Sequence, residues 1–453
     1  MDKKKRELDA REAALAALTR VEEDGAFVNL ALADVLASRP MDSRDKRLAT
    51  EITYGVISYK LTLDWLITQV AGRPTETLDS LIRQVLRIGF YQLFYLTRVP
   101  APAAVHATVE LVKKGKMRGL APFVNGVMRG ALRKKDSLPW PKRETDEAAY
   151  LSLHYSHPLW LVKRWLMRYG SQATEKLLAA NNSPAPVAVR VNTLRTTPPA
   201  LLEAFKEVGL VAEPSLVAPE GILLKQAGRL TGLALYRLGY FQVQGESAML
   251  TSLIVDPQPK ERVLDGCSAP GGKTSHLAQL MNNTGEITAL DIYPHRLELV
   301  AANCRRLGVD TVQTVCLDAR DVRLDVMGEY DRILLDVPCS GFGVIRRKPD
   351  LKWRREAGDI AELAHTQKVM LLACAELLKP GGVLVYSTCT NEPEETSHVV
   401  ATLLEERDDF AVADLRPYLP RKWHDSIGDL GVHLLPHIHN VDGFYISRLT
   451  RNK

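Results

Sequence analysis

Two short stretches of the chain end in the same way, with a cysteine just after an apolar run. Cys339 follows "LLDVP" and Cys389 follows "LVYST". The chain has only six cysteines, so two in matching positions need a chemical reason. A disulfide, a metal site, structural filling and covalent catalysis are the alternatives, because a cysteine can serve each of them. The secondary structure predicted around the two cysteines is needed to choose among these four roles.

The rest of the sequence argues against a disulfide and against a metal site. The first residues, "MDKKKRELDAREAALAAL", are charged throughout and lack the apolar stretch of a secretory signal. No apolar run approaches the length of about 18 residues that a membrane span needs. We therefore expect a cytoplasmic protein without membrane contact, in which a structural disulfide is disfavoured. No two cysteines are spaced as C-x-x-C, so no metal site is predicted.

A chain of 453 residues is long enough for two or three domains. Residues 1–140 predict an all-helical domain, and residues 137–147, with two prolines and many charges, predict a linker. Residues 148–245 mix helical and strand patterns, which indicates a small α+β subdomain. One helix of the first domain is marked by an apolar stripe at helical spacing, formed by Leu78, Leu81, Ile82, Val85 and Leu86.

The late helices of the first domain are basic. Two interpretations are open: a solvated polar face, or a patch that contacts an RNA backbone. The net charge of +5 is compatible with nucleic acid but is a weak signal alone. The basic residues are Lys113, Lys114, Lys116, Arg118, Arg129, Arg133, Lys134 and Lys135.

Residues 246–453 alternate short apolar runs with helical stretches. This pattern predicts an open, doubly wound α/β sheet, a Rossmann-like domain whose parallel strands are buried on both faces. Ligands of such sheets bind outside the carboxyl ends of the strands. The rule places four loops in one crevice, those after Asp265, Asp291, Asp336 and Thr388.

The first strand of this region runs into "DGCSAPGGKTSHLAQL". A phosphate loop would need a glycine where Cys267 stands, and the G-x-G-x-x-G fingerprint is absent. The segment therefore predicts neither of these motifs, but a glycine turn that leads into the N-terminus of a helix. Asp291 can accept hydrogen bonds from ribose hydroxyls, and Asp318, after the next strand, can accept one from an adenine amino group. A glycine turn with a ribose acceptor and an adenine acceptor, but without a triphosphate loop, indicates a site for S-adenosylmethionine. The alternative is that the aspartates only cap turns.

Three of these segments, "CSAPGGKT", "DVPCSGFGVIRRKPDLKW" and "YSTCTNEPEE", resemble the signature segments of the RNA cytosine-5 methyltransferases. Over its whole length the chain resembles the B-type, or Sun/Fmu, family of bacterial 16S ribosomal RNA cytosine-5 methyltransferases. Its helical region resembles the RNA-binding fold of transcription antitermination factors. Ser268 and Val337 stand where alanine is common, and neither change removes a functional group.

The resemblance implies an S-adenosylmethionine-dependent methyltransferase domain, preceded by an all-α RNA-binding domain and the small α+β subdomain. It implies small-subunit ribosomal RNA, before full assembly, as the partner, and we expect a monomer. Carried over by position, it makes Cys389 the nucleophile and Cys339 the residue that assists product release. The implied cofactor contacts are Cys267, Ser268, Ala269, Pro270, Gly271, Gly272, Lys273, Asp291, Arg296, Asp318 and Asp336.

The chemistry explains the need for a thiolate. Carbon 5 of cytosine is a poor nucleophile, and adding a thiolate to carbon 6 makes carbon 5 enamine-like. We expect Asp336 to contact the N3/N4 edge of the base, and Lys273 and Arg346 to favour the thiolate. Cys339 shares a loop with Asp336 and Cys389 comes from the neighbouring strand end, but the sequence alone does not settle their order. We expect the other strand and helix cysteines to be small buried hydrophobes: Cys304, Cys316 and Cys374.

The basic stretch "VIRRKPDLKWRRE" at 344–356 has two interpretations, a loop that contacts a polyanion or a solvated loop. The predicted function is methylation of carbon 5 of one cytosine in 16S ribosomal RNA. A transfer RNA substrate and a non-catalytic ribosome assembly factor are the alternatives. The intact set of Asp336, Cys339 and Cys389 argues against a non-catalytic protein.

Overall fold

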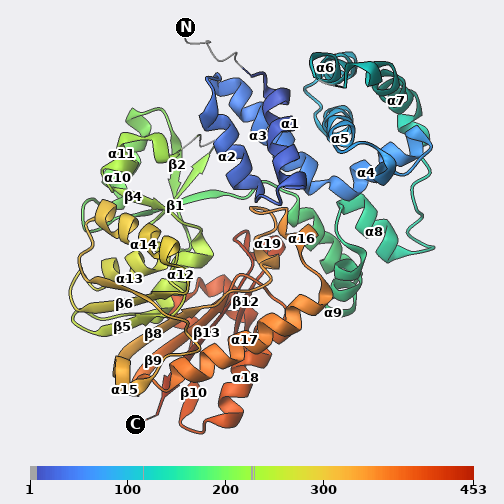
Figure 1. The fold of residues 1–453 in the computed structure, drawn as a ribbon. Coiled ribbons are helices and arrows are strands. Elements are labelled where there is room, and N and C mark those ends of the chain that lie inside the picture. Colours follow the sequence, from blue (N-terminus) through green and yellow to red (C-terminus); the bar gives the residue numbers. More distant parts are fainter. Residues whose placement is uncertain (1–7, 116, 226–227, 229, 453) are drawn as a thin grey trace. The chain divides into compact units, whose positions relative to one another are not determined.

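The computed structural model describes residues 8–115, 117–225, 228 and 230–452 (Figure 1). The chain forms two compact units, and each is described by itself. The first consists of residues 1–183 and 345–354, and the second of residues 184–344 and 355–453. The expected three-domain boundaries remain a prediction. This division differs from them because residues 148–183 cluster with the helical region, and a short late segment returns to it.

The first unit is helical, and its core lies around α5. The predicted apolar stripe is confirmed for Ile82, Val85 and Leu86, which are at most 1% exposed. Leu81 is only partly buried, and Leu78 is buried but precedes α5. The long helices are α1 (Ala10–Glu23), α2 (Val28–Ser38), α3 (Ser43–Ser58), α4 (Lys60–Ala71), α5 (Ser80–Tyr95), α6 (Ala101–Lys114), α7 (Ala121–Lys134), α8 (Glu147–Tyr155) and α9 (Leu159–Asn181).

The returning segment contains the short helix α16 (Leu351–Arg354) and packs into the first unit. Lys352 is fully buried, and its ammonium donates to Ser58 O at 2.8 Å. Burial lowers the pKa of Lys352 well below its ordinary value. Trp353 donates its ring N–H to Ile57 O at 2.7 Å and packs against the helical core. Both interpretations of 344–356 as a surface loop are therefore wrong for Lys352, which faces neither solvent nor a polyanion.

The second unit begins with a small antiparallel sheet in the order β2-β3-β1-β4. Its apolar core includes Val189, Phe205 and Phe241, which are fully buried. The elements are β1 (Val187–Val191), α10 (Pro198–Glu207), β2 (Val211–Pro214), β3 (Gly221–Lys225), α11 (Ala234–Arg237) and β4 (Phe241–Val243).

The large sheet of the second unit has the order β11-β12-β13-β9-β8-β5-β6-β7, with β10 paired to β13. Its strands are β5 (Arg262–Asp265), β6 (Glu286–Asp291), β7 (Val312–Cys316), β8 (Tyr330–Asp336), β9 (Leu378–Thr388), β10 (Phe410–Val412), β11 (Ile427–Gly428), β12 (Gly431–Leu434) and β13 (Phe444–Arg451). Strands β5 to β9 pair in parallel, as predicted, whereas β13 runs antiparallel to β9.

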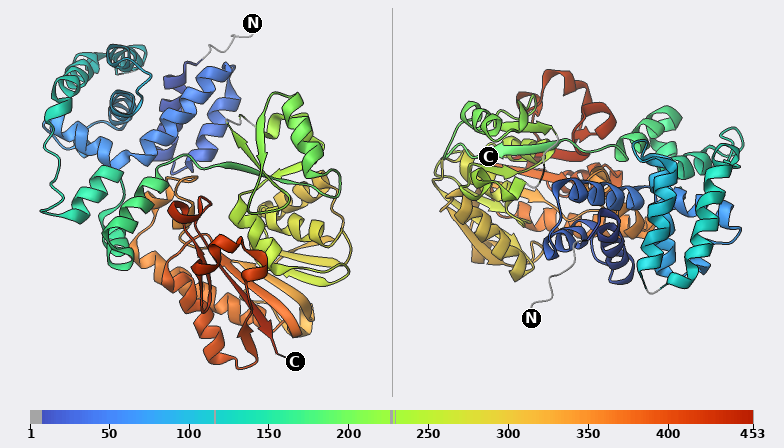
Figure 2. Two further views of the ribbon diagram at one scale, coloured as in Figure 1. Left: turned by 180° about the vertical axis from the view of Figure 1, so that it is seen from behind. Right: turned by 90° about the horizontal axis from the view of Figure 1, so that it is seen from above.

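Helices cover both faces of this sheet (Figures 1 and 2). On one face, α12 (Glu246–Val255), α13 (Gly272–Leu280) and α14 (Pro294–Leu307) build one apolar core with the strands. On the other face, α17 (Ala357–Ala375) and α18 (Ser397–Glu406) build a second core. Two short helices, α15 (Leu324–Met327) and α19 (Pro436–His439), lie in connections. The doubly wound, Rossmann-like fold predicted for this region is confirmed.

The strand order also locates the crevice. Strand β5 pairs with β6 on one side and with β8 on the other, so the order reverses there. A doubly wound sheet binds ligands at the carboxyl ends of the strands beside such a reversal. Among the residues that the structure describes, no helix is long and apolar enough to cross a membrane.

Candidate active site

The segment Cys267–Lys273 connects the end of β5 to the first turn of α13. Ser268 donates its backbone N–H and its hydroxyl to Leu290 O, each at 2.8 Å. Gly271 has a φ of +92°, a conformation that favours glycine, and a Cβ there would lie 3.0 Å from Val300 Cα. The backbone of this turn is therefore fixed and enters the N-terminus of α13, where a ligand can approach closely.

Asp291 is buried at the end of β6, beside this turn. Its carboxylate accepts a hydrogen bond from Tyr293 N at 3.0 Å and pairs with Arg296 Nη1 at 3.1 Å. Arg296 also donates to Ala269 O at 3.3 Å, which ties the aspartate to the turn. Each carboxylate oxygen has two lone pairs, so Asp291 can still accept two further hydrogen bonds.

Asp318 follows β7 and is held by Arg320. The hydrogen bonds from the Arg320 side chain, the shortest at 2.7 Å, lower the pKa of Asp318. Asp318 also accepts the backbone N–H of Arg320 at 2.9 Å, the contact of a turn residue. The turn-capping alternative thus accounts for its geometry, and its contact with a cofactor stays a prediction.

Lys273 reaches from the start of α13 to Asp336 at the end of β8. Its Nζ is 2.6 Å from Asp336 Oδ2, and Ser387 donates to Oδ1 of the same carboxylate at 2.8 Å. Burial opposes the ammonium charge, but Asp336 and the sulfur of Cys389 outweigh it and raise the pKa of Lys273. A charged lysine therefore lies near both the carboxylate and the predicted nucleophile. Arg346, also expected to support the thiolate, belongs to the first unit.

The sulfur atoms of Cys339 and Cys389 are 3.2 Å apart, and no disulfide joins them. The hydrogen bond to Cys389, together with burial, raises the pKa of Cys339 well above its ordinary value, and the charges of Glu395 and Asp336 add to this effect. The neutral thiol is therefore the favoured form of Cys339, and either sulfur can be the donor in the contact between the two cysteines.

The loop that carries Cys339 is braced by Glu395, which the sequence analysis missed. Glu395 is fully buried and accepts hydrogen bonds from Ser340 N at 2.8 Å and from Gln367 Nε2 at 3.0 Å. Gln367 also donates to Pro338 O at 2.9 Å. The acids of "NEPEE" follow Cys389 closely in sequence, but nothing in their spacing indicates which one points inward.

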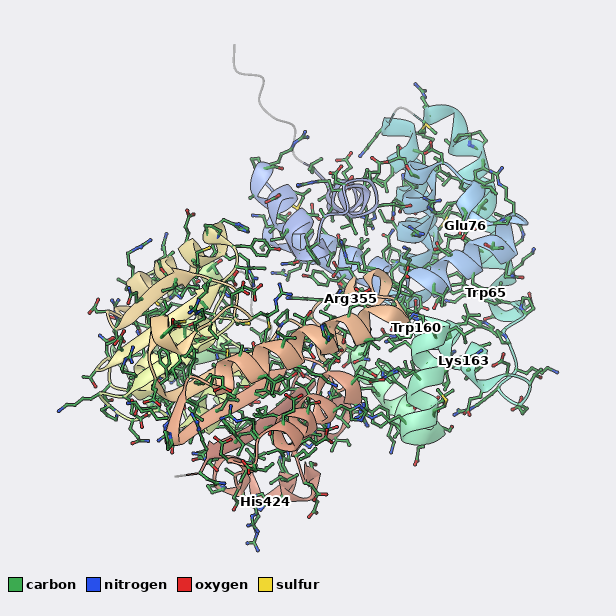
Figure 3. All side chains as sticks on the ribbon, turned by 60° about the horizontal axis from the view of Figure 1, so that its bottom comes forward. Trp65, Glu76, Trp160, Lys163, Arg355 and His424 are labelled. Carbon is green, nitrogen blue, oxygen red and sulfur yellow. The ribbon has the colours of Figure 1, made fainter. Side chains whose placement is uncertain are left out.

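Backbone contacts complete the support of the two cysteines. Gly343 N donates to Cys389 O at 2.9 Å, so the loop after Cys339 lies against the loop of Cys389. Arg355, labelled in Figure 3 beside the start of α17, places its Nη2 3.4 Å from Cys339 O. The strand ends and their loops thus hold both thiols in place.

Asp265, at the end of β5, is a second buried acid near the turn. It is 0% exposed, Thr274 donates its hydroxyl to Oδ2 at 2.7 Å, and burial raises the pKa of Asp265 to about 6. In the sequence, Asp265 is recognisable only as the end of a predicted strand. Its hydrogen bond with Thr274 joins β5 to α13 behind the turn.

The expectation for the three remaining cysteines was right for two of them. Cys304 and Cys374 are buried, but Cys316 is exposed. The reason is that β7 forms the edge of the sheet, where only one neighbouring strand covers it. Across the described ranges, no group of three or more His, Cys, Asp or Glu residues could hold a metal ion.

Substituting Lys273 tests how much this cation contributes. We expect Lys273→Met to lose about 1.5–3 kcal/mol of stabilisation of the reacting state, a tenfold to hundredfold loss in kcat/KM, because a charged hydrogen bond disappears. The acid limb of the pH–rate profile should also move to higher pH, since a thiolate without its cation forms less readily. Steady-state kinetics between pH 6 and 9 would measure both effects.

A matched control exists in the Lys379–Asp331 pair, 2.7 Å long, which joins β8 and β9 at their opposite ends. Lys379→Met should leave the pH–rate profile unchanged. An unchanged profile in Lys273→Met would show that Lys273 does not act on the nucleophile.

The strand order and the site at its carboxyl edge define the class: a Rossmann-like methyltransferase domain. Residues 252–450 match the family described as 16S rRNA methyltransferase RsmB/F. Residues 8–133 match the NusB family, and residues 157–231 match the ferredoxin-like domain of RsmF/B-like methyltransferases. The chain belongs to the 16S rRNA methyltransferase RsmB/F family, which confirms the family predicted from the sequence.

Relatives of nearly equal length support this membership. The chain is 37% identical to the probable ribosomal RNA small subunit methyltransferase B of Bacillus subtilis, over 97% of this chain and 98% of that protein. It is 34% identical to the ribosomal RNA small subunit methyltransferase B of Yersinia enterocolitica, over 97% and 98%. Among solved structures, a methyltransferase homolog protein from Pyrococcus horikoshii is 31% identical, with a TM-score of 0.59, over 68% of this chain and 99% of that one.

Proposed function

We propose that the protein transfers a methyl group from S-adenosylmethionine to carbon 5 of a cytosine in 16S ribosomal RNA, through a covalent bond between Cys389 and the base. The observation that carries the proposal is the pair of thiols, 3.2 Å apart, next to Lys273 and Asp336. The names of the relatives, which refer to the small-subunit ribosomal RNA, favour this RNA over transfer RNA.

The residues of the turn fit the proposed cofactor. Asp291 offers two free acceptor sites for ribose hydroxyls beside the Cys267–Lys273 turn, and the start of α13 lets the backbone approach a ligand. Arg296 fixes Asp291 against Ala269. The cofactor would supply the methyl group, as an electrophile, to carbon 5 of the base. The protein's own side chains would do the remaining work on the cytosine.

In this mechanism Cys389 adds to carbon 6 as a thiolate. The Cys339 S–H and the Lys273 ammonium both stabilise the negative sulfur before the addition. Asp336 is held by Lys273 and Ser387, which orients its carboxylate toward the edge of the base in our proposal. Adding the sulfur places electron density on carbon 5, which then takes up the methyl group.

The same two cysteines also explain how the methylated base is released from the protein. The hydrogen bond to Cys389 is the largest cause of the raised pKa of Cys339, and it weakens once Cys389 is bonded to carbon. Cys339 can then lose its proton to solvent and take the proton from carbon 5. As that C–H bond breaks, its electrons form the C5=C6 bond and the C6–S bond breaks, returning Cys389 as a thiolate. One proton is released for each methyl transferred.

The assignment of the ribose to Asp291 can be tested by binding. We expect Asp291→Ala to weaken S-adenosylmethionine binding by about 1.5–3 kcal/mol, tenfold to over a hundredfold, because a charged acceptor of two hydroxyls is lost. Isothermal titration calorimetry would measure the change. Asp325→Ala, which removes an exposed acid from α15, is the control. Equal affinities in Asp291→Ala and Asp325→Ala would exclude the assignment.

The helical region would supply RNA affinity. Among its predicted basic residues, Lys113 pairs with Glu110, Lys114 pairs with Asp9, and Lys135 donates to a backbone carbonyl. Lys116 lies outside the described residues. The remaining four are exposed, one in the short turn before α7 and three within α7, and are the best candidates for phosphate contacts: Arg118, Arg129, Arg133 and Lys134.

Replacing these four residues by glutamine in the full chain should weaken RNA binding and flatten its salt dependence. Each lost phosphate contact lowers the slope of log K against log salt by about 0.7–0.9. Truncation is a poorer test, because Lys352 and Trp353 would lose the helices that bury them. Four exposed basic residues of the second unit provide the control: Lys206, Lys225, Arg323 and Arg416. If both sets changed the slope equally, the helical patch would not be the RNA site.

Bisulfite sequencing tests the product. RNA from cells with and without this protein should differ at one cytosine of 16S ribosomal RNA, protected from conversion only when the protein is present. Protection in transfer RNA instead, or nowhere, would contradict the proposed function.

A further inference from the structure

The small sheet of the second unit carries a fully buried arginine that reaches the start of α13. Arg190, on β1, is 1% exposed. Its guanidinium donates to Gly272 O at 2.6 Å, to Ser275 Oγ at 3.0 Å and to Gln279 Oε1 at 3.2 Å, and it also contacts Gln244. Three of these four partners belong to α13, which begins directly at the glycine turn.

Burying this cation is costly, since a charge loses its hydration in the interior. Burial lowers the pKa of Arg190 to about 9, and the nearby Glu220 opposes this effect. Glu220 is itself hydrogen-bonded to the buried His276 of α13. An arginine of β1 and a glutamate just before β3 therefore both lie against one helix. A purely apolar contact would join the small sheet to α13 at a lower cost in free energy. We therefore expect the polar contacts to have a further role.

The position of the contacts indicates that role. Gly272 is the first residue of α13, and Lys273, the partner of Asp336, comes next. The guanidinium is planar and donates to several acceptors in a fixed arrangement. The flexible side chain of a lysine, with a single amine, does not fix its acceptors in this way. Movement of this first turn would displace the proposed cofactor site and Lys273 together.

We propose that Arg190 is a positioning residue, which holds the glycine turn and the first turn of α13 in the geometry that binds S-adenosylmethionine. The inference rests on the proposed function, in which this turn holds the cofactor. Arg190 acts through Gly272 and Ser275 and does not touch the reacting atoms.

The residue just after the end of β1 offers a matched control. Asn192, two residues after Arg190, is also buried, at 2% exposure. Its Nδ2 donates to Gly239 O and to Leu307 O, each at 2.8 Å. Leu307 is the last residue of α14, so Asn192 joins the small sheet to the large domain away from the glycine turn.

The test compares Arg190→Met, Arg190→Lys and Asn192→Ala in the full chain. Calorimetry with S-adenosylmethionine should show affinity about tenfold to a hundredfold weaker for Arg190→Met, and close to wild type for Asn192→Ala. Arg190→Lys should fall between them, because one amine cannot reach Gly272, Ser275 and Gln279 together. Hydrogen exchange should become faster in residues 267–280 of the Arg190 variants and stay unchanged there in Asn192→Ala.

Three results would overturn the proposal: wild-type affinity in Arg190→Lys, an equal loss in Asn192→Ala, or unchanged exchange in residues 267–280. If Arg190→Met does not fold, the affinity and hydrogen exchange of Arg190→Lys alone test the proposal. Failure of the proposed function would look different, because the wild-type protein itself would then not bind S-adenosylmethionine.

Discussion

Cys389→Ala should abolish methylation and should form no covalent bond with RNA, because the addition to carbon 6 never takes place. Loss of a nucleophile lowers kcat on the order of 10⁴-fold or more in enzymes that depend on one. The loss should leave cofactor affinity within a few-fold of wild type, since Asp291 and the glycine turn are untouched. Methyl incorporation into 16S ribosomal RNA from labelled S-adenosylmethionine would measure the rate.

Cys316→Ala is the matched control, because it removes an exposed cysteine from the edge strand of the same sheet. It should methylate at the wild-type rate. Substantial methylation by Cys389→Ala would contradict covalent catalysis by this residue.

Cys339→Ala should fail at a later stage and trap the RNA on the protein. Cys389 and Lys273 remain, so the addition and the methyl transfer still occur. The residue that takes the proton from carbon 5 is missing, and the C6–S bond therefore breaks slowly. An RNA–protein adduct should accumulate and survive denaturing electrophoresis, while turnover falls to the rate of the uncatalysed release.

The two variants also test the order of the cysteines. An adduct in Cys389→Ala and none in Cys339→Ala would reverse the two roles. Cys374→Ala removes a buried thiol of α17 and should give neither an adduct nor a change in turnover beyond its effect on stability.

The parts of the site that the sequence predicts are those tied to strand ends. Asp291, Asp336 and Cys389 each follow an apolar strand, and the rule for doubly wound sheets gathers such residues at one edge. The parallel pairing of β5 to β9 follows from the same alternation of strands and helices. The sequence did not predict that β13 runs antiparallel to β9, because "FYISRL" has no signal that sets the direction of the strand.

Residues that act through long-range contacts could not be predicted. Glu395 reaches Ser340 across 55 positions of the chain, and Arg190 reaches Gly272 across 82. Local patterns report only which face of an element is apolar, and they do not reveal which distant groups meet. Lys352 illustrates the same limit, since a basic stretch indicates a surface position and its burial depends on Ser58 of a different helix.

The most direct test of covalent catalysis uses the wild-type protein, in which both cysteines are available. In RNA with 5-fluorocytidine at the target position, carbon 5 carries no proton to remove, so the bond to the protein cannot be released. Digestion after lysine and arginine places Cys339 in peptide 333–346 and Cys389 in peptide 369–407, because Lys379 precedes a proline. Mass spectrometry should find the modified nucleotide in peptide 369–407, with fragment ions that assign it to Cys389 and not to Cys374. The nucleotide on Cys339, or on no cysteine, would contradict the account.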